Sequence, residues 1–382
     1  MKYCLNRKKI ILIFFLFLIF IEMTLIFPDQ AFSNFEESSF ISQVKDGFEK
    51  TEEKIELNYK MSFNSIDIDM ANNIIRKAVA AADDYIQYNI KNWKIEITGN
   101  NNQVDIFIDV DYYSNTEEYR YLTEKIDEIL SNITTSYMND HKKVKKITDY
   151  IAKNIRYDES KQKYSAYDAL IGGESTCQGY ALVTYIMLKE AGIENYIISG
   201  VMGGDRHAWN LLNLDGYYYH LDLTQISTHY QQYEELMYNE YLVSDSALSL
   251  KYSWDYGQYP EADKSYYTQL EQGLKYNDSQ LYQELIDELK LFYLQDKYTV
   301  DTLYRFEEIV KDTLRSGKEQ IKLRITDNSI GQADIKKVIN EIFSENDNIA
   351  SKYQQWRYNI FPYYIRDGIE DSSLITINFI RR

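Results

Sequence analysis

The stretch 175–224 constrains the fold of this chain more strongly than any other. It begins with Ser175 and Thr176, whose hydroxyls are typical acceptors for the free N–H groups at the start of a helix. The run 181–188 that follows is apolar on nearly all sides, and a glycine soon after it favours the end of the helix. This pattern predicts a buried helix whose first turn holds Cys177.

The position of Cys177 favours a reactive thiol. Unpaired N–H groups and the helix dipole stabilise negative charge at the N-terminus of a helix. A thiolate is the nucleophilic form of cysteine, and a helix start is one of the environments that lower the pKa of the thiol. The sequence therefore predicts a nucleophile held at the end of a rigid helix.

The second half of the stretch predicts a β-sheet. Residues 196–201 are β-branched and apolar, which favours a first strand. Two further segments, 206–214 and 217–224, flank the dipeptide Asp215-Gly216, which is a strong signal for a two-residue hairpin turn. We therefore expect an antiparallel hairpin that follows the helix in the chain.

This hairpin brings three informative side chains to one face. Trp209 lies opposite Asp222, and His207 is the diagonal neighbour of Asp222, because side chains alternate between the two faces of a strand. Diagonal neighbours are about 7–8 Å apart at the backbone, a separation that their side chains can close. A base and the carboxylate that orients it need such an arrangement.

The motifs CQGYA, HAWN and YHLDLT together resemble the transglutaminase-like superfamily, whose core is related to papain-like cysteine proteases. The preceding segments KKVKKITDYIAKNIRYDES and SAYDALIGGES also resemble bacterial members, so the resemblance covers roughly residues 140–227. It implies that Cys177 is the nucleophile, His207 the general base and Asp222 the carboxylate that orients the imidazole.

Two departures from the family pattern concern the rest of the site. Family members often have Trp after Asp-x-Thr, where this chain has Gln225. The papain-type glutamine, six residues before the nucleophile, is replaced by Ile171. The backbone N–H of Cys177 supplies part of an oxyanion hole, and the sequence assigns no side chain to the rest of it.

Several further side chains are candidates for the walls of a substrate cleft. Trp209, beside the base, is expected either to exclude water or to be part of the core. Gln178 and Tyr180 follow the nucleophile and are predicted to contact the substrate. Tyr157 and Tyr164 are candidates because they are close to the nucleophile in the sequence.

Each residue of the predicted triad also has a structural interpretation. An isolated Cys177 is most often a small core residue, His207 alone is more often a surface or turn residue, and Asp222 could cap a turn with Thr224. His220 shares their face of the hairpin but is paired further along it, and we interpret it as structural. The motifs taken together favour the catalytic interpretation.

Composition argues against several other classes of protein. The formal net charge of −17 at pH 7 argues against binding to nucleic acid, whose phosphates are neutralised by Lys and Arg. The sequence has no C-x-x-C, no H-E-x-x-H and no phosphate-binding glycine loop, and it has four histidines. We therefore expect neither a metal nor another cofactor.

The N-terminus predicts export. Arg7, Lys8 and Lys9 precede the apolar run 10–27, and small residues follow it. The run is long for a signal peptide and just long enough to span a bilayer, so segment 1–33 is predicted to be either a signal peptide or a membrane anchor. The rest of the chain is then extracellular or on the cell surface, with a single cysteine and no internal disulfide.

Segments on both sides of the core have the same predicted order of elements. Strand, helix, strand, strand is predicted for 54–110 and again for 320–380. We interpret the chain as an α+β protein with an N-terminal module at 34–115 and a papain-like or transglutaminase-like core at 116–262. In that core the helix with the cysteine packs on the antiparallel sheet with the histidine and the aspartate.

A helical connector and a C-terminal module are predicted for 263–382. The two βαββ segments that flank the core are either copies of one small module or a coincidence, because this order of elements is common in α+β domains. Modules of this kind bury one face of their sheet and leave the other face for a partner.

These features predict an exported cysteine-dependent acyl-transfer enzyme that acts on protein or peptide amides. Water would resolve the acyl-enzyme in a peptidase or amidase, and an amine would resolve it in a cross-linking enzyme; the triad does not decide between them. The alternative is a non-catalytic exported binding, scaffold or adhesin protein that keeps this fold. In both cases the flanking modules are candidates to bind a cell-wall or surface partner, and the N-terminal segment engages the membrane.

Overall fold

A computed structural model describes residues 10–15, 37–276, 279–289, 291, 296–363 and 372–381 of the 382-residue chain. The chain forms two compact units. The first contains residues 1–198 and 207–210, and the second contains residues 199–206 and 211–382. The boundaries predicted at 33, 115 and 262 stay predictions.

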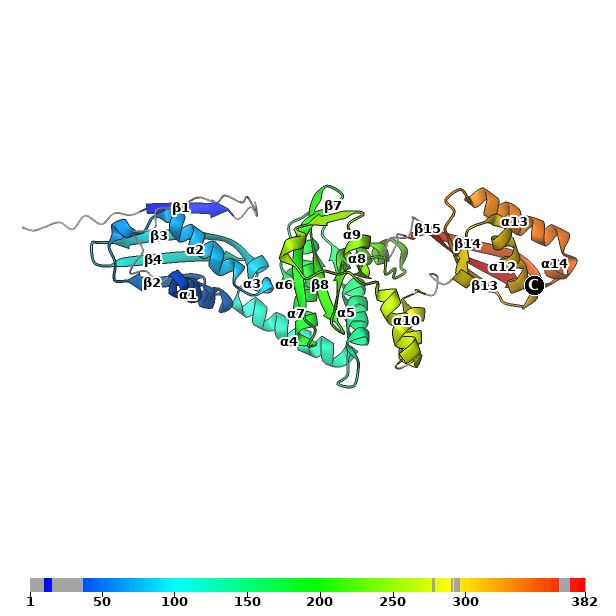
Figure 1. The fold of residues 1–382 in the computed structure, drawn as a ribbon, viewed down its shortest axis with the longest axis horizontal. Coiled ribbons are helices and arrows are strands. Elements are labelled where there is room, and N and C mark those ends of the chain that lie inside the picture. The colour runs from blue at the N-terminus through cyan, green and yellow to red at the C-terminus, as the bar shows by residue number, and fades with distance from the viewer. Residues whose placement is uncertain are drawn as a thin grey trace, which may run out of the picture. The chain divides into compact units, whose positions relative to one another are not determined.

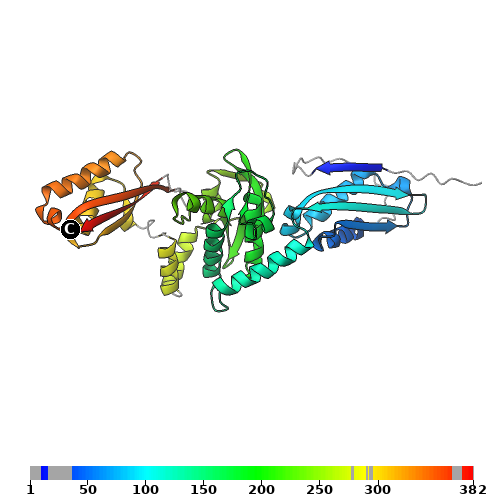
Figure 2. The ribbon, with the colours of Figure 1, turned by 180° about the vertical axis from the view of Figure 1, so that it is seen from behind.

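The first unit begins with an antiparallel sheet whose strands lie in the order β1-β3-β4-β2. These strands are β1 Ile10–Phe15, β2 Lys54–Tyr59, β3 Ile90–Gly99 and β4 Val104–Tyr112. The helices α1 (Glu37–Glu49) and α2 (Ile68–Ala80) lie on one face of the sheet (Figure 1), and Figure 2 gives the reverse view. The short helix α3 (Asp84–Asn89) leads into β3.

Alternation of apolar and polar residues explains this sheet. Ile55 and Leu57 of β2 and Ile106 and Ile108 of β4 are buried, whereas the residues between them are more exposed. The turn from β3 to β4 depends on Gly99, because a Cβ there would lie 2.5 Å from the carbonyl oxygen of Gln103. The predicted strand, helix, strand, strand order is therefore present in this segment.

Part of the segment that was predicted to direct export forms a strand of this sheet. Ile10–Phe15 form β1, which pairs with β3 at the edge of the sheet, whereas the prediction for 1–33 was a signal peptide or a membrane anchor. The rest of that prediction, at 1–9 and 16–33, lies outside the described residues. No helix among the residues that the structure describes has the length and apolar character needed to cross a membrane.

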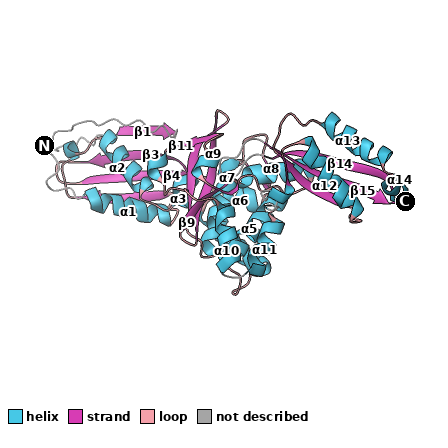
Figure 3. Ribbon diagram, turned by 45° about the vertical axis from the view of Figure 1, so that its right-hand side comes forward, coloured by secondary structure: helices cyan, strands magenta, loops and turns pink. Residues whose placement is uncertain are grey.

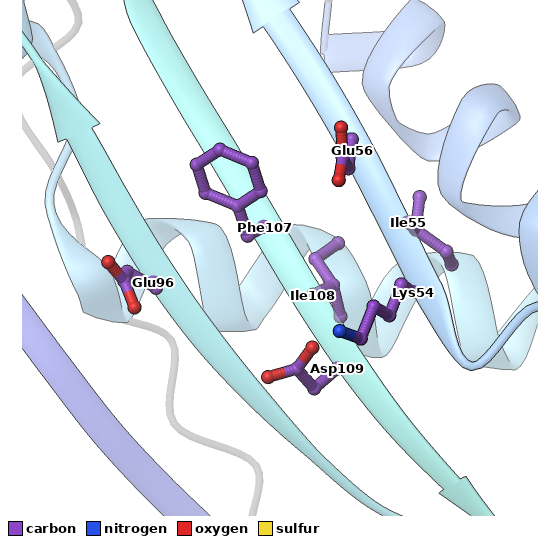
Figure 4. A pocket seen from close by; sticks show the side chains of 7 residues that line it. All are labelled: Lys54, Ile55, Glu56, Glu96, Phe107, Ile108 and Asp109. Carbon is purple, nitrogen blue, oxygen red and sulfur yellow. The ribbon is translucent and has the colours of Figure 1, made fainter.

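A hollow of about 280 Å³ lies on the N-terminal sheet (Figure 4) and is lined by Lys54, Ile55, Glu56, Glu96, Phe107, Ile108 and Asp109. Strand pairing places Glu56 and Glu96 on either side of Phe107, and it places Lys54 and Lys94 on either side of Asp109. Both signs of charge therefore alternate over this face, as expected of a solvated sheet. None of the predicted site residues lines the hollow.

The transglutaminase-like resemblance falls on a group of helices and a five-stranded sheet. The helices are α4 Thr116–Ile133, α5 Asp140–Asn154, α6 Ala166–Leu170 and α7 Cys177–Glu190. The strands lie in the order β10-β9-β8-β7-β11, and their bounds are β7 Asn195–Met202, β8 Asp205–Leu214, β9 Tyr217–Leu221, β10 Tyr241–Val243 and β11 Tyr252–Trp254. Two short parallel strands, β5 (Arg156–Tyr157) and β6 (Glu174–Ser175), precede α7.

The helix α7 is the buried rod that the sequence predicts. All its residues from Gly179 to Leu188 are buried, and each fully buried aliphatic side chain contributes about 1.5–3 kcal/mol of hydrophobic free energy. The helix ends before Gly192, whose φ of +83° is the left-handed conformation of a helix C-terminus. Asn210 of β8 donates to the carbonyl oxygen of Ala181 at 3.1 Å, which ties this helix to the sheet.

The predicted hairpin is present, but its second strand is shorter than predicted. Asp215 and Gly216 have φ values of +54° and +85°, as a type I′ turn requires, so the predicted turn is confirmed. The strand β9 ends at Leu221, and α8 (Leu223–Tyr233) begins where the sequence predicted strand through Thr224. The reason is Asp222, whose side chain caps α8 and ends the alternation.

The C-terminal part of the second unit contains a sheet in the order β12-β13-β15-β14. Its strands are β12 Thr299–Val300, β13 Gln320–Ile325, β14 Tyr353–Tyr363 and β15 Ser372–Arg381. Its helices are α12 Leu303–Arg315, α13 Gln332–Glu345 and α14 Asp347–Lys352 (Figure 3). The remaining helices of the unit are α9 Asp245–Leu248, α10 Tyr266–Tyr276 and α11 Ser279–Glu288.

Candidate active site

The first turn of α7 lacks the side-chain cap that the sequence predicted. Thr176 is the N-cap residue, but its hydroxyl makes no capping hydrogen bond and is buried without a partner. The hydroxyl of Ser175 instead donates to the carbonyl oxygen of Lys163 at 2.9 Å. The prediction of hydroxyl capping is therefore wrong, and no capping side chain uses the first N–H groups beside Cys177.

Gly179 allows the start of α7 to pack closely on its surroundings. A Cβ at this position would lie 1.9 Å from the hydroxyl oxygen of Ser175 and 2.6 Å from the carbonyl oxygen of Ser165. Ser165 is itself fixed, because it caps α6 and exchanges hydrogen bonds with Asp168. The position of the half-buried Cys177 therefore depends on the segments that precede it.

The loop 158–163 is joined to the residues just before the cysteine. The strand residue Tyr157 pairs with Ser175, and the N–H of Thr176 donates to the carbonyl oxygen of Lys163 at 2.9 Å. The carboxylate of Asp158 accepts hydrogen bonds from Ser160 and from the N–H groups of residues 162 and 163, and these bonds lower its pKa to about 2. These hydrogen bonds hold the loop in one conformation and join it to the residues that precede Cys177.

Of the two tyrosines noted near the nucleophile in the sequence, Tyr157 interacts electrostatically with Cys177. Burial raises the pKa of its hydroxyl, and the neighbouring Cys177 raises it further. The phenol is therefore a protonated hydrogen-bond donor at neutral pH, within electrostatic range of the sulfur. Tyr164 instead donates to the carbonyl oxygen of Lys161 and packs its ring against Tyr113, with 5.5 Å between ring centroids.

His207 and Trp209 lie on β8 with parallel rings. Their ring centroids are 6.0 Å apart and their planes differ by 21°, so the two side chains share a face of the strand as predicted. His207 is 7% exposed and Trp209 is 1% exposed. His207 belongs to the same compact unit as Cys177. A buried imidazole beside an indole is shielded from water, which suits a general base.

Asp222 belongs to the second unit and has an extensive set of donors. Its Oδ1 accepts from the N–H groups of Thr224 at 3.0 Å and Gln225 at 3.4 Å. Its Oδ2 accepts from the hydroxyl of Tyr252 at 2.7 Å. Burial and the charge of Asp222 raise the pKa of Tyr252 far above its usual value, so this hydroxyl always donates. The sequence also allowed Asp222 to cap a turn with Thr224, and it does so while its second oxygen binds Tyr252.

Tyr252 is the residue of this site that sequence reasoning missed. The sequence has 37 tyrosines, and Tyr252 follows no motif, so composition gave no reason to select it. The signal lies in strand pairing, because β11 pairs with β7 and places Tyr252 opposite Met202. That pairing is formed by residues far apart in the chain, which local patterns do not report.

Gln178 and Tyr180, which were predicted to contact the substrate, both have structural partners. The side-chain amide of Gln178 donates to the carbonyl oxygen of Tyr88 at 2.9 Å. Tyr180 is 1% exposed, and its hydroxyl donates to the carbonyl oxygen of Ile155 at 2.7 Å, so it has almost no surface for a substrate.

The remaining histidine of the hairpin is structural, as the sequence indicated. The Nε2 atom of His220 lies 2.7 Å from Oδ1 of Asp245, and its ring packs edge-on against Trp254. Burial lowers the pKa of His220, and the partly opposing effect of Asp245 is smaller. Among the residues that the structure describes, no group of three or more His, Cys, Asp or Glu is arranged to hold a metal ion.

Residues 127–223 match the family model described as the transglutaminase-like superfamily. This segment is a transglutaminase-like core. The resemblance predicted from the three motifs is therefore confirmed for this segment. The transglutaminase-like core contains Cys177, His207 and Asp222 within its bounds, and it forms about a quarter of the chain.

Three solved structures have a weak likeness to the chain. A protein from Cytophaga hutchinsonii, described provisionally as a cysteine protease, is 15% identical with a TM-score of 0.23, over 35% of this chain and 57% of that one. A structure described as a TGase is 15% identical with a TM-score of 0.23, over 45% and 50%. A protein from Parabacteroides distasonis, described provisionally as a protease, is 10% identical with a TM-score of 0.20, over 76% and 62%.

In each of these pairs the alignment covers less than two thirds of the other protein. A search of curated proteins gives no match. The family assignment of the transglutaminase-like core therefore depends on the family model.

Proposed function

We propose that the transglutaminase-like core is a cysteine-dependent acyl-transfer site. Cys177 is its nucleophile, His207 its general base and Asp222 the residue that orients the imidazole. The observation that carries this proposal is the first turn of α7, where the thiol lies on the first helical residue and no side chain caps the neighbouring N–H groups. Those N–H groups and the helix dipole favour a thiolate. The family match over 127–223 supports the same assignment.

The proposed reaction has two steps. His207 accepts the proton of the Cys177 thiol, and the sulfur attacks the carbonyl carbon of an amide. The C–N bond breaks as His207 returns the proton to the leaving amine, and a thioester remains on the cysteine. Water or a second amine then attacks the thioester, with His207 as the base, and releases an acid or a new amide.

Three groups in addition to the triad support this chemistry. The N–H of Cys177 is available to the oxyanion that forms on the carbonyl oxygen. Tyr157 contributes a protonated hydroxyl near the sulfur. Tyr252 donates to Asp222 and keeps that carboxylate oriented. The hydrogen bonds to both oxygens of Asp222 stabilise its charged form.

The test is site-resolved alkylation of the full-length chain by iodoacetamide between pH 5 and 9. Mass spectrometry follows the labelling of Cys177, and free glutathione in the same mixture serves as the reference thiol. An unperturbed thiol titrates at about 8.5, and a thiol paired with histidine reacts well below about pH 7. We expect fast labelling of Cys177 near pH 6, which is lost in His207→Ala and reduced in Asp222→Asn.

Labelling of Cys177 that follows the profile of an unperturbed thiol would contradict the proposed function. With an activated thiol, incubation with glutamine peptides in the presence and absence of a primary amine separates the two outcomes of the second step. Release of ammonia with incorporation of the amine identifies a transamidating enzyme. Cleavage or deamidation that does not depend on the amine identifies a hydrolase.

We further propose that the protein is exported, on the basis of the basic residues 7–9 and the apolar run 10–27 that follows them. Expression in a bacterium, followed by fractionation and N-terminal sequencing, tests this proposal. A mature N-terminus near Asn34 identifies a signal peptide, and an intact chain in the membrane fraction identifies an anchor. Recovery of the intact chain in the cytosol would contradict export.

A further inference from the structure

A short segment of the N-terminal region contacts α7 at both of its ends. This segment, residues 83–89, contains α3 and is called the α3 arm below. It lies between α2 and β3, so it belongs to the part of the chain for which the sequence predicts a separate flanking module. Its contacts with α7 are side-chain hydrogen bonds, so single substitutions can remove them one at a time.

The far end of α7 is held by the first two residues of the α3 arm. Oδ2 of Asp83 accepts from the hydroxyl of Tyr185 at 3.0 Å and also binds the ammonium group of Lys189. Oδ2 of Asp84 accepts from the N–H of Ile197 in β7 at 2.6 Å. These bonds attach the arm to the C-terminal half of α7 and to the strand that follows it.

The α3 arm contacts the near end of α7 through a hydrogen bond beside Cys177. Nε2 of Gln178 donates to the carbonyl oxygen of Tyr88 at 2.9 Å. Gln178 is adjacent to Cys177 in the first turn, where no side chain caps the helix. The other side-chain hydrogen bond of this turn is that of the Tyr180 hydroxyl to the carbonyl oxygen of Ile155, among the bonds that the structure describes.

The α3 arm is itself rigid at the end that receives Gln178. The next residue, Asn89, is fully buried, and its amide donates to the carbonyl oxygen of Ser114 at 2.9 Å and accepts from the N–H of Ser114 at 2.8 Å. A buried side chain with both of its polar groups paired is held in one orientation. The carbonyl oxygen of Tyr88 is therefore a fixed acceptor.

We propose that Gln178 is a positioning residue for the nucleophile, and that it holds the first turn of α7 against the α3 arm. The N-terminal segment is then part of the active site, and its role extends beyond that of a separate binding module. This proposal rests on the proposed function, since it assigns Gln178 a role in presenting Cys177. The neutral amide of Gln178 makes this contact without adding a charge beside the thiolate.

The test compares two attachments of the same arm. Gln178→Met keeps the length of the side chain and removes its hydrogen-bond donors. Asp83→Asn is the matched control, because it removes the charged contact with Lys189 at the far end, whereas asparagine still caps α3. Each full-length variant is alkylated at Cys177 across pH, with free glutathione as the reference thiol, and its melting temperature is measured.

We expect Gln178→Met to slow the labelling of Cys177 near pH 6 by 5-fold or more, with a wild-type melting temperature. Asp83→Asn should lower the melting temperature and keep the wild-type labelling profile. If Gln178→Met does not fold, Gln178→Asn is measured in its place, since its shorter side chain does not reach Tyr88.

The positioning role is overturned if the Gln178 variant labels like the wild type while the wild type shows an activated thiol. It is also overturned if both variants slow labelling equally, because a general loss of packing would then explain the effect. An ordinary thiol in the wild type would instead contradict the proposed function, so the two failures are distinguishable.

Discussion

The N-terminal and C-terminal sheets share the arrangement of three strands, but they differ in the pairing of the fourth strand and in their contacts with the rest of the chain. In each, the order along the chain is strand, helix, strand, strand, and the third of these strands lies between the other two, as in β2-β4-β3 and β13-β15-β14. The C-terminal sheet has a hydrophobic cluster drawn entirely from residues 300–379. The N-terminal sheet is bound to α7 through the polar contacts of the α3 arm.

The two segments therefore differ in the contacts through which their roles can be tested. The N-terminal segment also has a buried apolar interior, with Phe48 and Ile106 fully buried, but it is bonded to α7 as well. The origin of the two segments as copies of one module stays a prediction. Their different attachments to the rest of the chain are what the following experiments test.

The largest effect is expected from removal of a core aromatic residue. Phe306 of α12 is fully buried in the C-terminal cluster, so Phe306→Ala should destabilise that segment by about 3–5 kcal/mol. Limited proteolysis should then cleave within 299–381, while Cys177 keeps its labelling profile. The matched variant Phe48→Ala removes a fully buried ring of the N-terminal segment and should also slow the labelling. Equal effects on labelling would remove the distinction between the two segments.

A smaller effect is expected from Tyr252→Phe in the second unit. The variant keeps the ring and removes the hydrogen bond to Asp222, and a bond to a charged group contributes about 1.5–3 kcal/mol. Stability should fall by an amount in this range, and labelling of Cys177 near pH 6 should slow. This result would show that the second unit affects the reactivity of Cys177 through Asp222 and Tyr252, and not through the C-terminal sheet. Unchanged labelling, with lowered stability, would make Tyr252 a packing residue only.

The smallest effect is expected in how the melting temperature of an Asp158 variant depends on acid pH. The pKa of Asp158 is lowered to about 2, mainly by the hydroxyl of Ser160, from about 3.9 in an unfolded chain. Its stabilising contribution is therefore present above about pH 4 and is lost as the pH falls towards 2. The difference in melting temperature between wild type and Asp158→Asn should shrink over this window.

A corresponding carboxylate serves as the control in the other unit. Hydrogen bonds from Ser329 lower the pKa of Asp327, so Asp327→Asn should show acid dependence of the same sign. Because Asp327 belongs to the C-terminal sheet region, its variant should leave Cys177 labelling unchanged, whereas Asp158→Asn should slow it. A loss of labelling in both variants would show that the two regions are coupled.

Features with a local physical cause could be predicted from the sequence. The Asp215-Gly216 turn follows from residues that tolerate positive φ, and the helix that starts at Cys177 follows from an apolar run that ends before Gly192. The three motifs that led to the family are also local. The structural role of His220 followed from its place in the hairpin.

Features that depend on distant residues could not be predicted. Ser175 is a good helix cap by type, but the carbonyl oxygen of Lys163 takes its hydroxyl. Gln178 bonds to a residue 90 positions earlier in the chain, and Asp222 receives a hydroxyl from 30 positions later. A periodic pattern contains no information about such partners, because it reports only which face of an element a residue occupies.

The packing around Gly179 leaves no space for a side chain at the start of α7. The contacts with Ser165 and Ser175 fix the position of the first turn of α7. Reacting atoms must approach to about 3–3.5 Å, and a displacement of about 1 Å can cost about 100-fold in rate. One added methyl group at residue 179 would displace the first turn of α7, although every reactive group would still be present. Such a variant would lose activity because its reactive groups are misplaced, and not because one of them is absent.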